Sequence, residues 1–133
     1  MKEKNKAHNL SGPTKAQLEI LQVLWNSGPA TVRFVNDQLN SQKEATSYTS
    51  TLKLMQIMHE KQMLTRDETS MTHIYSTTLK EQTIKQHELK KFVDTMYNGS
   101  AKNLMMELLG HAKTTKKEWQ TIQELLNKME NDK

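Results

Sequence analysis

The chain has 133 residues, of which 35% are hydrophobic and 5% aromatic, with a formal net charge of +4 and no cysteine. The lack of cysteine excludes disulfides, thiolate zinc sites and thiol catalysis, and no apolar run approaches the roughly 18 residues that a membrane helix needs. So low an apolar content favours a core completed by a second chain, and the mild positive charge is compatible with a polyanionic partner. We therefore expect a cytoplasmic protein that dimerises and does not insert into a membrane.

The first two helices are predicted from capping and spacing. Residues 1–12 are rich in lysine and show no periodicity, so we expect a flexible arm there. Thr14 and Gln17 have the spacing of a capping box, which predicts a helix that ends before Gly28. A second helix is predicted over residues 31–39, with its apolar residues on one face.

The third predicted helix begins after Ser47, a preferred N-cap residue, and places Leu54, Ile57 and Met58 on one apolar face. Its first turn carries hydroxyl groups, and a lysine follows on the same polar side. Such a turn suits the major groove of DNA, where hydroxyls and lysine bond base edges and phosphates. Taken alone, the pattern is equally that of any well-capped helix.

Two short runs rich in threonine, isoleucine and tyrosine follow, at residues 63–67 and 72–76, and predict a β-hairpin. Three helices followed by a hairpin is the order of elements in a winged helix-turn-helix domain. The predicted fold is therefore mainly α with a small β-hairpin, and the winged-helix domain is expected to span residues 1–78.

The remaining residues, 79–133, are expected to form three amphipathic helices, with breaks at residues 98–100 and after Gly110. Ser100 and Thr115 are the predicted N-caps of the last two helices. Helices this short cannot bury their apolar faces alone, so we predict a helical dimerisation domain in which two chains share one core. The alternative is that these helices fold back on the first domain. The predicted interface residues are Ile84, Phe92, Met96, Leu104, Leu108, Trp119, Ile122 and Leu126.

Several segments together resemble the penicillinase-repressor family, the winged-helix repressors of β-lactamase and methicillin-resistance operons and their copper-responsive relatives. They are residues 14–25, 28–33, 48–52, 60–61 and 92–99. The resemblance implies a homodimeric repressor of transcription on a palindromic double-stranded DNA operator, released when a membrane metalloprotease sensor triggers its cleavage. The cysteine pairs of the copper-responsive members are absent, and Gln62 stands where the family has glycine after the third helix.

The resemblance also assigns roles to individual residues. The groove-reading positions fall on Thr49, Ser50 and Lys53, with Ser47 and Tyr48 at the helix start; the contribution of the hairpin falls on Arg66, His73 and Tyr75. The scissile bond maps to Lys91 and Phe92, although Phe92 also lies on the apolar stripe and is equally explained as a dimer-core side chain.

Other classes of function find less support in the residues. The five histidines form no metal-binding pair, and the sequence contains no HExxH, P-loop or GxSxG motif, so we expect no catalytic site, metal or cofactor. The second hypothesis is a protein-interaction scaffold with a winged-helix fold that does not bind DNA. The salt dependence of DNA binding distinguishes the two hypotheses. A DNA-binding protein should lose affinity for DNA steeply as ionic strength rises, whereas a protein-interaction scaffold should not bind DNA at all.

Overall fold

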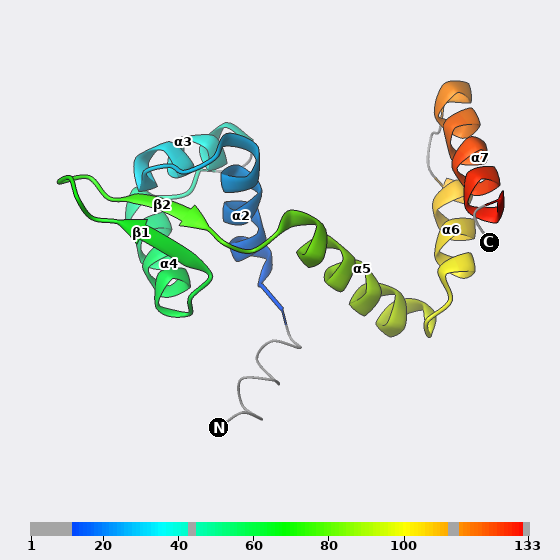
Figure 1. Cartoon of the computed structure of the whole chain (residues 1–133), viewed down its shortest axis with the longest axis horizontal. Helices are drawn as coiled ribbons and strands as arrows, with labels where there is room; N and C mark the ends of the chain where they lie inside the picture. The colour runs from blue at the N-terminus through cyan, green and yellow to red at the C-terminus, as the bar shows by residue number, and fades with distance from the viewer. Residues whose placement is uncertain (1–11, 43–44, 112–114, 132–133) are drawn as a thin grey trace. The chain divides into compact units, whose positions relative to one another are not determined.

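The computed structural model describes residues 12–42, 45–111 and 115–131. The predicted N-terminal arm lies outside these residues, apart from Gly12. The elements are α2 (Lys15–Ser27), α3 (Val32–Gln42), α4 (Tyr48–Glu60), β1 (Leu64–Asp67), β2 (Ile74–Thr77), α5 (Glu81–Tyr97), α6 (Ala101–His111) and α7 (Lys116–Asn131) (Figure 1). The mainly helical fold with one small hairpin confirms the predicted fold class.

The described chain falls into two compact units, which are divided between Glu88 and Leu89, inside α5. The N-terminal unit holds α2 to β2 and the first half of α5. The C-terminal unit holds the rest of α5 together with α6 and α7. Each unit is described by itself below.

Helix α2 begins with the predicted capping box. The Gln17 backbone N–H donates to the Thr14 hydroxyl over 3.2 Å, and the Thr14 N–H donates to the Gln17 side-chain oxygen over 2.9 Å. Two orphan donors of the helix start are thus satisfied reciprocally. The helix ends at Gly28, whose φ of 81° places it in the left-handed region, and the Gly28 N–H donates to the Leu24 carbonyl over 2.8 Å.

In the N-terminal unit α2, α3 and α4 pack on one another, and the hairpin contacts α4 and α2. The strands are antiparallel, with Leu64 opposite Thr77 and Asp67 opposite Ile74. A short bridge joins β2 to the segment between α2 and α3: the Ala30 N–H donates to the Tyr75 carbonyl over 2.9 Å, and the Tyr75 N–H donates back over 2.8 Å. The hairpin is therefore fixed to the helices by backbone hydrogen bonds as well as by packing.

The core of the N-terminal unit is closed within one chain. Its buried apolar side chains come from every element of the winged helix: Ile20, Leu21, Val23, Leu24, Ala30, Val32, Val35, Leu39, Met55, Met58, Leu64 and Tyr75. On α4 the buried face is centred on Thr51, Met55 and Met58, whereas Leu54 and Ile57 are only half-buried. The apolar stripe predicted for this helix is thus rotated relative to the face that the fold buries.

In the C-terminal unit the turns are well formed. At the end of α5, Asn98 and Gly99 have φ values of 51° and 82°, and the Gly99 N–H donates to the Val93 carbonyl over 3.1 Å. The hydroxyl of Ser100 then caps α6, and that of Thr115 caps α7. The predicted breaks between these helices therefore have the predicted capping residues.

The apolar faces of the C-terminal helices stay open. Among its described side chains, Val93 is the one buried apolar residue, and it is 9% exposed. Large apolar side chains with more than a third of their surface exposed are Leu89, Phe92, Met96, Met106, Leu108, Trp119, Leu125 and Leu126. Among the described residues, no helix combines the length and the apolar character required to cross a membrane.

Candidate nucleic-acid interface

The first turn of α4 presents polar side chains to solvent. The Ser47 hydroxyl accepts from the Ser50 backbone N–H over 3.1 Å and donates to the Ser50 hydroxyl over 2.8 Å, which fixes the helix start. Tyr48, Thr49, Ser50 and Lys53 are all exposed. The five residues predicted to read DNA on this helix therefore lie together, and the fold leaves them accessible.

A buried amide holds this turn in place. Asn36 on α3 is 4% exposed, and its side-chain N–H₂ donates to the Thr51 hydroxyl over 2.8 Å, to the Thr46 carbonyl over 2.9 Å and to the Ser47 carbonyl over 3.2 Å. A buried amide without hydrogen-bond partners would lower the stability of the fold. The arrangement in which Asn36 meets these three acceptors is therefore strongly favoured. The α3–α4 connection is thereby fixed at the point where the polar turn begins.

Beside this turn lies a groove of about 440 Å³ between the start of α3, helix α4 and the hairpin. We call the hairpin with its loop, residues 64–77, the wing. The groove is lined by side chains from all three elements, and its charged, polar and aromatic members include Arg33, Tyr48, Gln56, Arg66, His73 and Tyr75. A groove with two arginines suits a polyanion better than a neutral ligand.

Arg33 is a lining residue that sequence analysis missed. It lies in the first turn of α3, and its guanidinium carbon is 4.5 Å from the centre of the Tyr48 ring, a cation–π contact. A cation in the first turn of a helix is disfavoured by the helix dipole, so its position there was the signal that could have identified it. Arg33 and Tyr48 bring the starts of α3 and α4 together on one wall of the groove.

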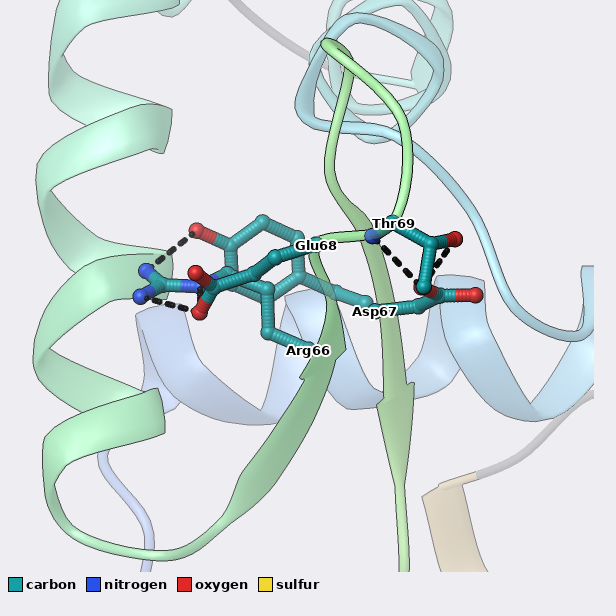
Figure 2. A network of polar contacts seen from close by, with 5 residues as sticks. Arg66, Asp67, Glu68 and Thr69 are labelled. Carbon is teal, nitrogen blue, oxygen red and sulfur yellow. Dashed lines mark hydrogen bonds and ion pairs between the residues drawn. The ribbon is translucent and has the colours of Figure 1, made fainter.

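Arg66, on the wing side of the groove, is held by two partners (Figure 2). Its Nε and Nη2 both lie 2.8 Å from Oε2 of Glu68, and its Nη1 donates to the Tyr75 hydroxyl over 3.4 Å. The hydrogen bond with Tyr75, followed by that with Glu68, raises the pKa of Arg66. The hydrogen bond and charge of Arg66 lower the pKa of Glu68, and the charges of His73 and His59 add to this effect.

The other two residues predicted on the wing differ in their accessibility. His73 is half-buried and lines the groove. Tyr75 is 1% exposed, with its ring packed in the core and an edge-on contact to His59 at 6.4 Å between ring centres. Tyr75 therefore orients Arg66 through its hydroxyl, and its side chain is almost fully buried where it borders the groove.

The residues predicted for cleavage and dimerisation lie on α5, α6 and α7. Lys91 is half-buried, and Phe92 is 46% exposed with its ring 6.0 Å from that of Tyr97. Ile84 lies in the half of α5 that belongs to the N-terminal unit. The remaining predicted interface residues are half-buried or exposed: Met96, Leu104, Leu108, Trp119, Ile122 and Leu126. Among the residues that the structure describes, no group of three or more metal-ligating side chains is clustered.

Three packed helices, a two-stranded wing and an exposed helix start define a winged helix-turn-helix protein. The family model described as "Penicillinase repressor" matches residues 13–128. The curated protein named "Penicillinase repressor" from Staphylococcus aureus is 21% identical over 112 residues, which cover 84% of this chain and 88% of that protein. The chain belongs to the penicillinase repressor family, and it is a transcriptional regulator of the repressor class rather than an enzyme.

Proposed function

We propose that the chain represses transcription as a homodimer that binds a palindromic DNA operator, with α4 in the major groove. The observation that carries this proposal is the exposed polar turn of α4 beside a groove lined with arginine. Hydroxyls and lysine at a helix start bond base edges, while arginines beside them neutralise phosphates. In this proposal Thr49, Ser50 and Lys53 contact bases, and Arg33, Arg66 and His73 contact the backbone.

Dimerisation follows from the uncovered faces of the C-terminal helices. Phe92, Met96, Leu108, Trp119 and Leu126 all expose large apolar surface in the single chain. Large exposed apolar side chains in such number are typical of a protein interface, and a second copy offers the same side chains for a two-fold symmetric contact. Two copies related in this way present two α4 helices, so the operator would have two half-sites about 34 Å apart or a multiple of that spacing.

Release by proteolysis is the second part of the proposal, and family membership supports it. A cut between Lys91 and Phe92 would separate the DNA-binding unit from α6 and α7. The bond lies inside α5, so the helix must open locally before a protease can reach it. The exposed ring of Phe92 is consistent with both a dimer contact and a cleavage site. A membrane metalloprotease sensor would start this event in response to a signal such as a β-lactam.

The direct test of DNA binding compares two duplexes of equal length, one from the region upstream of the chain's own gene and one from its coding sequence. Fluorescence anisotropy should give tighter binding to the upstream duplex, and affinity should fall steeply as salt rises. A footprint should show two protected half-sites. Equal affinity for both duplexes, or no binding at low salt, would refute operator recognition and leave the scaffold hypothesis.

The test of release is a mass measurement of the repressor in cells exposed to a β-lactam. The proposal predicts a fragment that ends at Lys91 and its complement that begins at Phe92. A Phe92→Ala variant, and a Lys102→Ala variant as a control on exposed α6, would show whether the cut depends on this position. An intact chain during full derepression would contradict release by cleavage.

A further inference from the structure

The wing carries two consecutive carboxylates that have different partners (Figure 2). Asp67 Oδ1 accepts from the Thr69 backbone N–H over 2.9 Å and from the Thr69 hydroxyl over 2.7 Å. Glu68 instead turns to Arg66, and its Oε2 accepts from both Nε and Nη2. Asp67 therefore fixes the turn of the loop, whereas Glu68 forms an ion pair with Arg66, one of the cationic residues that line the groove.

The occupied edge of Arg66 is one of its two phosphate-binding edges. A guanidinium binds carboxylates and phosphates through pairs of N–H groups that point in the same direction, such as Nε–H and Nη2–H. Glu68 takes both of these donors, and the Tyr75 hydroxyl accepts one further N–H from Nη1. A DNA phosphate that approached the Nε–Nη2 edge would meet a carboxylate already in its place.

Glu68 is also free to leave without disturbing the fold. Its side chain is 52% exposed, and it lies in the loop between β1 and β2. The loop backbone is held independently by Asp67 and Thr69, and Arg66 is backed by the buried Tyr75. Displacement of Glu68 therefore needs only a rotation of its side chain.

We propose that Glu68 acts as an internal competitor of DNA: its carboxylate holds the Nε–Nη2 edge of Arg66 in the free protein, and a backbone phosphate that binds this edge must displace it. This inference rests on the proposed function, and it assigns Glu68 the regulation of affinity at the same site. The exchange lowers the affinity for all DNA sequences alike, since phosphates carry no base identity. A repressor limited in this way depends more on its base contacts for stable binding.

The test uses Glu68→Gln in the full-length protein, which keeps the shape of the side chain and removes its charge. Binding of a short mixed-sequence duplex and of the upstream duplex is measured by anisotropy at about 50 mM salt. We expect Glu68→Gln to bind both duplexes about 2- to 5-fold more tightly, because an exposed ion pair no longer has to be broken. The matched control is Glu60→Gln, an exposed residue that does not line the groove; it should change affinity less than about 2-fold.

Arg66→Ala separates competition from simple repulsion. If Glu68 acts through Arg66, the gain from Glu68→Gln should fall to the level of the Glu60 control when Arg66 is alanine. A gain of the same size in both backgrounds would overturn the inference. Unchanged binding by Glu68→Gln would also overturn it. Weaker binding would overturn it and would mean that Glu68 positions Arg66 for DNA. If the wild type bound neither duplex, the proposed function would fail as well; wild-type binding without the tightening refutes the internal competitor alone.

Discussion

The two units of this chain both consist largely of amphipathic helices, but they bury the apolar faces of these helices to very different extents. In the N-terminal unit Leu21, Val35, Met55 and Met58 are 0% exposed, so the apolar faces close on one another within a single chain. In the C-terminal unit Met96 remains 62% exposed. The difference shows that an apolar stripe predicts a buried face but does not tell whether the residues that cover it belong to the same chain or to another one. A hairpin and three mutually packed helices cover the first set, whereas the second set stays uncovered in the single chain, and we propose that another copy covers it.

This contrast has a thermodynamic consequence. A core closed within one chain has a free energy of unfolding that does not depend on protein concentration. A core shared between two chains is stabilised by mass action, so its stability rises with concentration. The predictions below use this difference.

The largest effect is expected for Trp119→Ala on α7. Two copies of the side chain would be lost from one dimer interface, and truncation of a buried tryptophan costs about 3 to 5 kcal/mol. Sedimentation equilibrium at micromolar concentration should show monomer, and DNA binding should fall because both half-sites are required. The exposed Gln120→Ala on the opposite face of the same helix is the control and should remain dimeric. A Trp119→Ala protein of unchanged dimer mass would contradict the assignment of this face.

The second prediction compares the same truncation in each unit. Leu21→Ala removes a side chain that is 0% exposed and should lower the free energy of unfolding of the N-terminal unit by about 2 to 5 kcal/mol. Its effect should be equal at low and high protein concentration, and the dimer should persist. The destabilising effect of Leu126→Ala should instead become smaller as the protein concentration rises. Urea unfolding at two concentrations measures both, and concentration-independent loss for Leu126→Ala would place that residue in an intrachain core.

Lys53→Ala should act on binding alone. The side chain is exposed on α4, so we expect normal stability and a loss of about 1 to 3 kcal/mol in affinity for the upstream duplex if it contacts base edges. Lys61→Ala, an exposed lysine at the other end of α4, controls for the loss of one charge. Anisotropy that gave the same affinity for both variants would remove Lys53 from the reading surface.

The smallest effect concerns the turn after α4. Gln62 has φ of 64°, and the Met63 N–H donates to the Met58 carbonyl over 2.9 Å, as in a Schellman turn that favours glycine. Gln62→Gly should stabilise the N-terminal unit by about 0.5 to 1 kcal/mol, since relief of the strained conformation outweighs the greater freedom of glycine in the unfolded chain. The same change at Gln56, inside α4, should destabilise by about 1 kcal/mol. Urea unfolding checks both signs, and a loss of stability from Gln62→Gly would show that the turn is not strained.

Much of the fold could be predicted from local rules. Thr14, Ser47, Ser100 and Thr115 all cap the helices that their positions predicted, because a cap depends on residues close in sequence. Gln62, which stands where the family has glycine, also has a positive φ.

Features set by distant residues could not be predicted in this way. The inward face of α4 was misplaced, because the hydrogen bond between Asn36 and Thr51 draws a polar residue into the core, and hydropathy does not register it. Tyr75 was assigned to the DNA surface by resemblance, although its pairing with Ala30 holds its ring in the core. The first-turn position of Arg33 is visible in the sequence, but its contact with Tyr48 is not, because that contact depends on the packing of α3 against α4.

The most direct test of the account is the stoichiometry of the complex with DNA. Sedimentation of the full-length chain with a duplex from its own upstream region measures how many chains bind each duplex. The account predicts two chains per duplex for the wild type, and none at the same concentration for Trp119→Ala. One wild-type chain per duplex, or no co-sedimentation at low salt, would contradict it.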